Sequence, residues 1–264
     1  MSWADVLNTP VKAIPLDAPK VFDLPRFDGY QDPKKLDVLT RLSESYGRDP
    51  RLATLAVQIF RGANVQPRDY KGQAAALLKW VQTNIYYVNE PDERLQTPDY
   101  TLRVRYGDCD DMAILLYSLA RSVRLPAKFV ISGVDNAKQK RRYHYGDATF
   151  PRNVNWSHIY LAIGDRPYGA PAWIYAEPTL KVPFGWDVVG ANSSALAEMN
   201  QYSGATTGAM IGAAVGGVEA SGERSWWKEM FFVAVSAGVG ALASEIVIDF
   251  YKDWKSSRKA GKSK

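Results

Sequence analysis

The chain has 264 residues, of which 46% are hydrophobic and 23% are charged. That length allows one substantial core with extensions or two small domains, and we expect one domain with extensions. A single cysteine excludes an internal disulfide framework and leaves one free thiol, which suits a reducing compartment. The first residues have neither the basic start nor the apolar run of a cleaved signal peptide. We therefore expect the protein to lie on the cytosolic side of a membrane.

The net charge of +5 comes from the end of the chain. The tail 252–264 has six of the 33 basic residues and only one of the 28 acidic residues. Residues 1–251 therefore have 27 of each. The basic balance therefore describes a tail and excludes a basic nucleic-acid-binding domain in the rest of the chain. Nucleic acid is expected as a partner only through this tail.

Residues 1–33 are rich in proline and have few periodic apolar positions, which predicts an extended N-terminal arm without visible chemistry. Three helices are predicted next. The first ends near Gly47, the second begins at Asp49-Pro50 with a capping residue and a proline in the first turn, and the third ends near Ile85. Their apolar positions recur at helical spacing: Leu36, Leu39 and Leu42; Leu52, Leu55, Ala56, Ile59 and Phe60; Ala74, Leu77, Leu78 and Val81.

Two polar segments are predicted to be long loops. Residues 89–107 contain Pro91 and Pro98 and lead into the next helix, and long loops in compact domains are often functional. Residues 135–153 carry basic residues that we interpret as a solvated charge run rather than a binding patch: Lys138, Lys140, Arg141, Arg142 and His144.

The cysteine lies where a further helix is predicted to begin. Gly107 breaks the preceding segment, Asp108 is placed to cap the free N–H groups, and Asp111 completes a pattern like a capping box. The helix itself is predicted from apolar residues at the spacing of one buried stripe: Met112, Leu115, Leu116, Leu119 and Val123.

Cys109 falls in the first turn of this helix, where the helix dipole favours the nucleophilic thiolate. The carboxylates of Asp108, Asp110 and Asp111 act against it, because like charge raises a thiol pKa. Ionisation near neutral pH therefore needs a cationic partner such as a histidine. Taken alone, Cys109 fits a buried structural thiol as well as a nucleophile. The three acidic residues lack a matching ligand set, so neither a metal nor a cofactor is expected.

Strands are predicted at 127–132, 156–163 and 172–177, each rich in residues that favour strands. Alternation puts His158 on the opposite face from Ile159. If the loop between the last two strands is centred between Pro167 and Tyr168, antiparallel pairing brings His158 opposite Glu177 or one residue away. A slip of one residue would separate the two side chains.

A thiol at a helix start, a histidine on a strand and a carboxylate at the next strand supply a nucleophile, a general base and a group that orients the base. The backbone N–H of Cys109 is placed to help form an oxyanion hole. Each residue also has a structural interpretation, because His158 fits a histidine satisfied within the sheet and Glu177 fits a charge at a strand end.

Together these residues resemble the transglutaminase-like superfamily over about residues 70–180. The segments that carry the resemblance follow in chain order: Ala75-Ala76-Leu77-Leu78-Lys79-Trp80-Val81-Gln82, Ile85-Tyr86-Tyr87, Gly107-Asp108-Cys109-Asp110-Asp111, Ala120-Arg121, Leu125-Pro126-Ala127-Lys128-Phe129-Val130, Trp156-Ser157-His158-Ile159-Tyr160 and Tyr175-Ala176-Glu177-Pro178-Thr179.

The resemblance implies an α+β, papain-like core in which a nucleophile helix packs on an antiparallel sheet, with Cys109, His158 and Glu177 as the triad. The chain departs from the family at Glu177, where aspartate is usual, and at Arg124, where glycine is usual. The family includes transglutaminases, amide hydrolases and inactive binding modules. The resemblance therefore implies a thiol-dependent acyl transfer to water or to an amine, and we favour hydrolysis of a peptide or isopeptide amide because it needs no second substrate pocket.

The composition changes after about residue 192. Gly204, Gly208, Gly212 and Gly216 recur every four residues, a pattern that lets helices approach closely in lipid. The segment 230–250 is largely apolar and is flanked by Trp226, Trp227, Tyr251, Trp254 and the basic tail, which is typical of a membrane interface.

We therefore expect a membrane-inserted helical hairpin within 204–250, with a single span or a surface helix as alternatives. The expected organisation is an arm at 1–33, a catalytic domain at 34–190, a glycine-rich membrane segment at 191–251 and a basic tail at 252–264. Expected partners are a protein or peptide substrate, membrane lipid, and a second copy of the chain through the glycine face. The expected location is the cytosolic side of a membrane or a lipid-containing virion, and a non-catalytic membrane or virion component is the alternative to an enzyme.

Overall fold

A computed structural model describes residues 1–16, 21–25, 27, 29–89, 94–135, 141–147 and 153–189. The chain divides into two units, Met1–Gly204 and Ala205–Lys264, and every described residue lies in the first. The predicted glycine-rich hairpin and basic tail therefore lie outside the described residues. Within the described part, no helix has both the length and the apolar character needed to cross a membrane.

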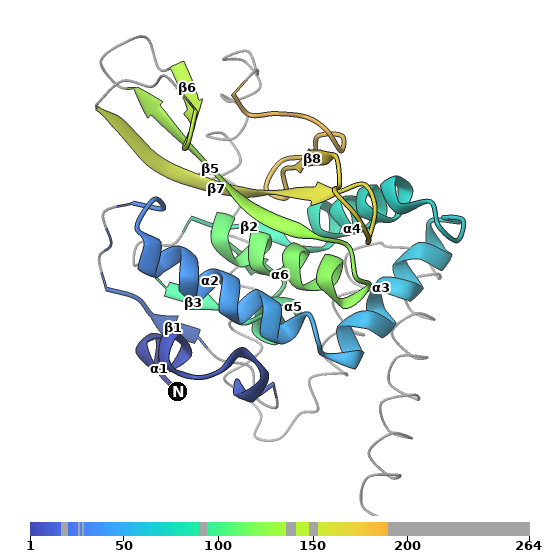
Figure 1. Ribbon diagram of the computed structural model, residues 1–264, viewed down its shortest axis with the longest axis horizontal. Coiled ribbons are helices and arrows are strands. Elements are labelled where there is room, and N and C mark those ends of the chain that lie inside the picture. The colour runs from blue at the N-terminus through green and yellow to red at the C-terminus, as the bar shows by residue number, and fades with distance from the viewer. Residues whose placement is uncertain are drawn as a thin grey trace, which may run out of the picture. The chain divides into compact units, whose positions relative to one another are not determined.

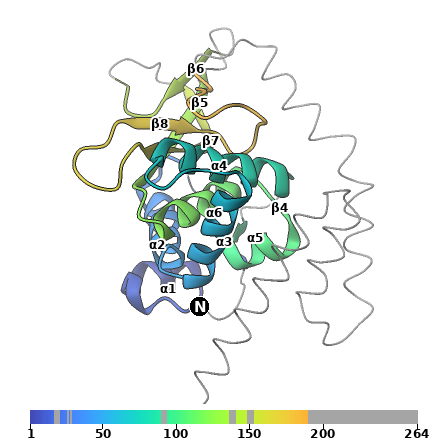
Figure 2. The same cartoon turned by 90° about the vertical axis from the view of Figure 1, so that its right-hand side faces the viewer.

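The described unit has a layer of helices covered by an antiparallel sheet (Figures 1 and 2). The sheet has the strand order β6-β5-β7-β8, and its four members are bounded as follows: β5 Ala127–Asp135, β6 Arg141–His144, β7 Val154–Gly164 and β8 Trp173–Ala176. The main helices are α2 Pro33–Tyr46, α3 Pro50–Gly62, α4 Tyr70–Asn84 and α6 Cys109–Ser122. This confirms the predicted α+β class with helices preceding the sheet.

The helices begin where short acidic side chains cap free backbone N–H groups. Asp49 accepts a hydrogen bond from the N–H of Arg51 and Pro50 follows it, as predicted for the start of α3. Asp32 and Pro33 begin α2 in the same way, three residues earlier than the apolar pattern indicates. Asp69 caps α4 by accepting from the N–H of Gly72.

Helix α6 is the centre of the core. The sequence predicts one buried stripe, but every residue from Cys109 to Ala120 is buried. The reason is that α6 contacts α2, α3, α4 and α5 (Pro98–Val104) as well as β7, so that no face is left to solvent (Figure 2). Its first turn, with Cys109, is therefore held in place by packing on all sides.

The segments predicted to lack regular structure contain short elements, and these predictions are corrected. The proline-rich N-terminal arm has a helix α1 (Trp3–Asn8), a 3-10 turn η1 (Val11–Ala13) and a strand β1 (Val21–Asp23), because Val6, Ile14 and Phe22 are buried in the core. The predicted loop 89–107 has β3 (Arg94–Gln96), which pairs with β1, then α5 and β4 (Tyr106–Gly107), which pairs with β2 (Tyr86–Tyr87). The predicted loop 135–153 has β6.

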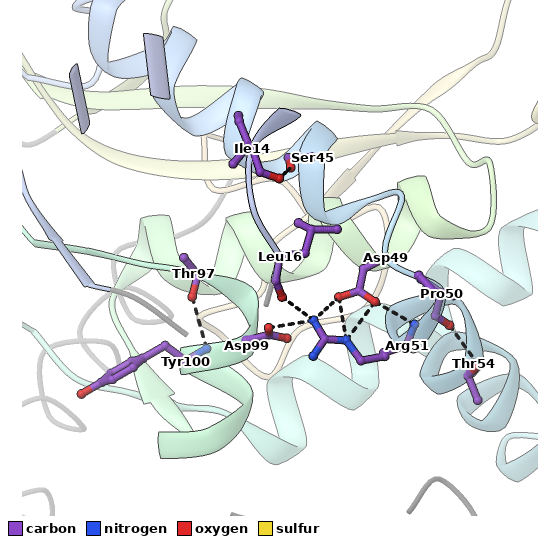
Figure 3. A network of polar contacts seen from close by, with 10 residues as sticks. All are labelled: Ile14, Leu16, Ser45, Asp49, Pro50, Arg51, Thr54, Thr97, Asp99 and Tyr100. Carbon is purple, nitrogen blue, oxygen red and sulfur yellow. Dashed lines mark hydrogen bonds and ion pairs between the residues drawn. The ribbon is translucent and has the colours of Figure 1, made fainter. Parts of the chain in front are cut away.

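An arginine at the start of α3 joins two of these segments to the helical layer (Figure 3). The guanidinium of Arg51 donates to Asp49 next to it, to Asp99 of α5 at 2.9 Å and to the backbone carbonyl of Leu16 at 2.7 Å. Burial raises the pKa of Asp99 to about 6, although the positive charge of Arg51 acts to lower it. The contacts fix α5 and the N-terminal segment to the helical layer.

Candidate active site

The start of α6 has the capping arrangement that the sequence predicts. Asp108 Oδ1 accepts hydrogen bonds from the N–H groups of Asp110 and Asp111, and Asp111 Oδ2 accepts from the N–H of Asp108 at 3.4 Å. Gly107 is required here, because a Cβ atom at that position would lie 2.6 Å from Cβ of Asp111. The cap holds Cys109 as the first residue of the helix, with its N–H free of the intrahelical ladder.

The thiol of Cys109 is buried, with 5% of the residue exposed. The backbone N–H of Ile159, which follows His158 in β7, acts to lower the pKa of this thiol. Burial raises the pKa of the Cys109 thiol well above its ordinary value, and the charges of Asp108 and Asp110 raise it further. These effects outweigh the lowering of the pKa by Tyr30 and Ile159, so the resting group is a thiol. Asp108 and Asp110 thus act as the sequence predicts, whereas Asp111 is not among the residues that shift this pKa.

His158 and Glu177 are in direct contact. The Nε2 atom of His158 lies 2.6 Å from Oε2 of Glu177, and both residues are buried. The other oxygen of Glu177 accepts from the N–H of Thr179 at 2.9 Å and from its hydroxyl at 2.6 Å. Burial acts to raise the pKa of Glu177, but His158 and Thr179 outweigh it and the pKa is lowered. Glu177 is therefore a carboxylate held on both sides, and its contact occupies Nε2 of His158, which leaves Nδ1 as the other ring nitrogen.

The side chain of Gln82 fixes the segment that carries Glu177. Its amide donates to the backbone carbonyls of Glu177 and Val182, each at 2.9 Å. Gln82 lies in α4, so this buried amide ties the helical layer to the chain just beyond β8.

The register between β7 and β8 differs from the prediction by two residues. Leu161 pairs with Ala176, so the position across from Glu177 corresponds to Tyr160 and not to His158. The physical reason is that the connecting loop is centred after Tyr168 rather than before it. Because side chains alternate with a period of two, the shift leaves His158 and Glu177 on the same face, where a diagonal pair still meets.

A β-bulge lies beside His158. Ser132 pairs with His158 and Val134 pairs with Asn155, so that β7 takes three steps where β5 takes two. Bulges bend a strand and change the direction of the side chains next to them. Near the bulge, the carbonyl of Trp156 accepts a hydrogen bond from the N–H of Tyr30. This bond brings the segment before α2 to β7.

Tyr30 is a site residue that the sequence analysis missed. Its hydroxyl lies 3.1 Å from the sulfur of Cys109 and donates to Asp110 Oδ2 at 3.3 Å. The ammonium of Lys35 lies 3.7 Å from the same carboxylate oxygen and 3.9 Å from the centre of the Tyr30 ring. A single tyrosine in a proline-rich segment gives no periodic pattern, so the sequence holds no signal for this contact between residues 79 positions apart.

A second polar cluster adjoins His158 on the sheet. The Tyr160 ring stacks on the His158 ring with centroids 5.7 Å apart. The Tyr160 hydroxyl lies 2.7 Å from Nε2 of His144 and donates to Asp187 at 2.9 Å. His144 is thus half-buried in a polar network and not solvated, which corrects the interpretation of the basic run. Arg142 is also partly buried, and burial lowers its pKa, whereas Arg141 is exposed. Lys138 and Lys140 lie outside the described residues.

The acidic side chains of Asp108, Asp110 and Asp111 each present an oxygen within 4.8 Å of the others. Their oxygens have partners within the protein. Asp108 and Asp111 form the capping box, Asp111 also accepts from the N–H of Gln96 at 2.7 Å, and Asp110 pairs with Lys35. The arrangement fits a capped helix start, and a metal is not needed to explain it.

Residues 62–178 match the transglutaminase-like superfamily. This part of the chain is therefore similar to that superfamily. The match includes Cys109, His158 and Glu177, as the resemblance read from the sequence predicts, whereas Tyr30, Lys35 and Asp187 lie outside it. The transglutaminase-like region thus holds the three candidate catalytic residues, and segments before and after it add to the site.

Among solved structures, a crystal structure from Cytophaga hutchinsonii, provisionally described as a cysteine protease, is similar to the chain. The identity is 18%, the TM-score is 0.34, and the similarity covers 51% of this chain and 38% of the other. A likeness of this size implies nothing about the activity of the chain. Among curated proteins, no relative matches the sequence.

Proposed function

We propose that the protein is a thiol-dependent acyl-transfer enzyme in which Cys109 is the nucleophile, His158 the general base and Glu177 the group that orients the base. The observation that carries the proposal is the 2.6 Å contact between His158 and Glu177. His158 lies on β7, the strand that packs against α6, the helix of Cys109. A nucleophile, a base and an orienting carboxylate are the parts that such chemistry needs. The match of residues 62–178 to the transglutaminase-like superfamily supports the same reaction class.

In the proposed reaction, Nδ1 of His158 takes the thiol proton as the sulfur attacks a substrate carbonyl. The raised pKa of Cys109 means that the thiolate forms only as His158 becomes an imidazolium, and Glu177 stabilises that charge. The tetrahedral intermediate collapses, the leaving amine takes the proton from His158, and a thioester remains on Cys109. Water or an amine then attacks the thioester and regenerates the thiol.

We propose hydrolysis of a peptide or isopeptide amide as the reaction, with transglutamination as the alternative, because hydrolysis requires no second substrate pocket. The full chain is incubated with fluorescein-labelled casein to detect hydrolysis, and with dimethylcasein and dansylcadaverine to detect amine incorporation. Either activity should be abolished by Cys109→Ala and by His158→Ala. Neither activity in the native chain, or activity that survives Cys109→Ala, would overturn the proposal.

One observation favours a second candidate, a binding module without catalysis. The Cys109 thiol is buried, its pKa is raised, and the Tyr30 hydroxyl lies against it. The two candidates differ in how iodoacetamide alkylation of Cys109 depends on His158. An activated pair predicts that His158→Ala slows alkylation at neutral pH, whereas an inert thiol predicts the same slow rate in both chains.

We also propose, from the sequence, that residues 204–250 tether the protein to a membrane, with the catalytic domain on the cytosolic side or inside a lipid-containing virion. The support is the glycine spacing and the aromatic and basic flanks. The full chain should float with vesicles of phosphatidylcholine and phosphatidylserine and resist extraction by alkaline carbonate. Release by high salt alone would instead indicate attachment through the basic tail 252–264. Self-association through Gly204, Gly208, Gly212 and Gly216 predicts cross-linked dimers in detergent that Gly208→Leu and Gly212→Leu reduce.

A further inference from the structure

The loop before α2 carries Tyr30 to both parts of the candidate site. Its backbone N–H donates to the carbonyl of Trp156, two residues before His158 on β7, at 3.1 Å. Its hydroxyl, at the other end of the side chain, lies 3.1 Å from the sulfur of Cys109. Gly29 makes the turn that permits this, with φ +80 and no room for a Cβ atom beside the carbonyl of Trp156. Tyr30 is 8% exposed, so the side chain is held rather than free to swing.

The hydroxyl of Tyr30 is equipped to stay protonated and to donate. Burial raises its pKa well above the ordinary value, and the charges of Asp110, Cys109 and Asp108 raise it further. Its hydrogen bond to Asp110, at 3.3 Å, is longer than the 2.7–2.8 Å usual between two oxygens, so the proton is weakly held there. The ammonium of Lys35 lies beside that carboxylate, and its positive charge makes the carboxylate a weaker hydrogen-bond acceptor. A donor beside the sulfur is therefore available when new negative charge appears.

We propose that Tyr30 is a catalytic residue that donates a hydrogen bond to the oxyanion formed when Cys109 attacks a carbonyl. This inference rests on the proposed acyl transfer and adds a donor to it from outside the superfamily region. As the sulfur bonds to the carbonyl carbon, the π electron pair moves to the oxygen, which then lies next to the sulfur and within reach of the Tyr30 hydroxyl. The backbone N–H of Cys109 is the second donor. On collapse the pair re-forms the carbonyl, the leaving group departs, and Tyr30 keeps its proton throughout.

The experiment compares two reactions of the same sulfur in the full chain. p-Nitrophenyl acetate acylates a thiol through an oxyanion and releases p-nitrophenolate, whereas iodoacetamide alkylates a thiol by displacing iodide, with no oxyanion. Tyr30→Phe should lower the acylation rate on the order of 100-fold, as loss of one oxyanion donor does elsewhere, and should change alkylation little. The matched control is Tyr117→Phe. Tyr117 lies in α6, eight residues after Cys109, and the change removes a hydroxyl that donates to Glu44.

Each other outcome overturns the inference. Equal losses in acylation and alkylation would mean that Tyr30 stabilises the thiolate, and gains in both would mean that it shields the thiol. No change in either would remove any role. If Tyr30→Phe does not fold, 3-fluorotyrosine in place of Tyr30 keeps the ring and is a stronger donor, and it should raise acylation relative to alkylation. If Cys109→Ala releases p-nitrophenolate as fast as the native chain, the proposed function itself is wrong. If Cys109→Ala abolishes release but Tyr30→Phe does not act as expected, only the inference about Tyr30 is wrong.

Discussion

Nε2 of His158 and Oε2 of Glu177 are 2.6 Å apart although the two residues are not paired across the strands. Glu177 lies one residue beyond the end of β8, where Thr179 and Gln82 hold it in place of a ladder partner. The longer side chain of glutamate fits this position, because it must reach diagonally to His158. The Glu177 carboxylate is thus fixed by contacts outside the sheet.

Glu177→Gln should lower the rate of Cys109 acylation about 100-fold or more, because the neutral amide no longer stabilises an imidazolium at His158. Glu177→Asp is the matched variant, since it keeps the charge and shortens the reach by one methylene. The acylation rate of Glu177→Asp should fall between those of the native chain and Glu177→Gln. The measurement is p-nitrophenolate release under single-turnover conditions, and a native rate in Glu177→Gln would contradict the role given to this carboxylate.

Asp108→Asn should make Cys109 more reactive. The charge of Asp108 raises the pKa of the thiol, whereas asparagine caps a helix as well as aspartate does. Removing the charge lowers the pKa and shifts the pH profile of iodoacetamide alkylation toward acid, so that alkylation at neutral pH becomes severalfold faster. Asp37→Asn, a change at an exposed acidic residue of α2, is the control and should leave the profile in place. An unchanged profile in Asp108→Asn would mean that burial alone sets the pKa.

The parts of the site that follow local rules could be predicted from the sequence. The capping box around Cys109 uses residues three positions apart, and the shared face of His158 and Glu177 survives a register error of two because side chains alternate with that period. These are patterns within one helix or one hairpin. The fold class follows from the same local periodicities, together with the superfamily resemblance.

The parts that depend on distant contacts could not be predicted. Tyr30 reaches Cys109 because a turn at Gly29 and a bulge in β7 bring two remote segments together, and neither is visible in a hydrophobic pattern. The same limit explains why the sequence predicts a solvated basic run around His144. Its partners, Tyr160 and Asp187, lie 16 and 43 residues further along the chain.

Lys35 and Asp110 should show strong coupling in stability. The two charged groups lie 3.7 Å apart with 2% of each side chain exposed. Lys35→Met keeps the apolar stem but leaves the carboxylate buried without this partner, which typically costs about 3–5 kcal/mol. The double variant Lys35→Met/Asp110→Asn should recover most of that loss, because neither charge remains. Urea unfolding of the four chains gives the coupling energy, and additive effects would contradict a direct interaction.

Asp99 should make the protein less stable as the pH rises from about 4 to about 6. Burial raises its pKa in the folded chain from the ordinary 3.8 to about 6, so the folded state binds more protons than the unfolded state in that range. A raised pKa contributes stability that is complete below the unfolded value and is lost as the pH passes the folded value. Asp99→Asn keeps the shape and removes this titration, so its unfolding free energy should fall less between pH 4 and 6. Asp37→Asn, at an exposed carboxylate, should follow the native curve, and identical slopes in native and Asp99→Asn chains would show that Arg51 neutralises Asp99 fully.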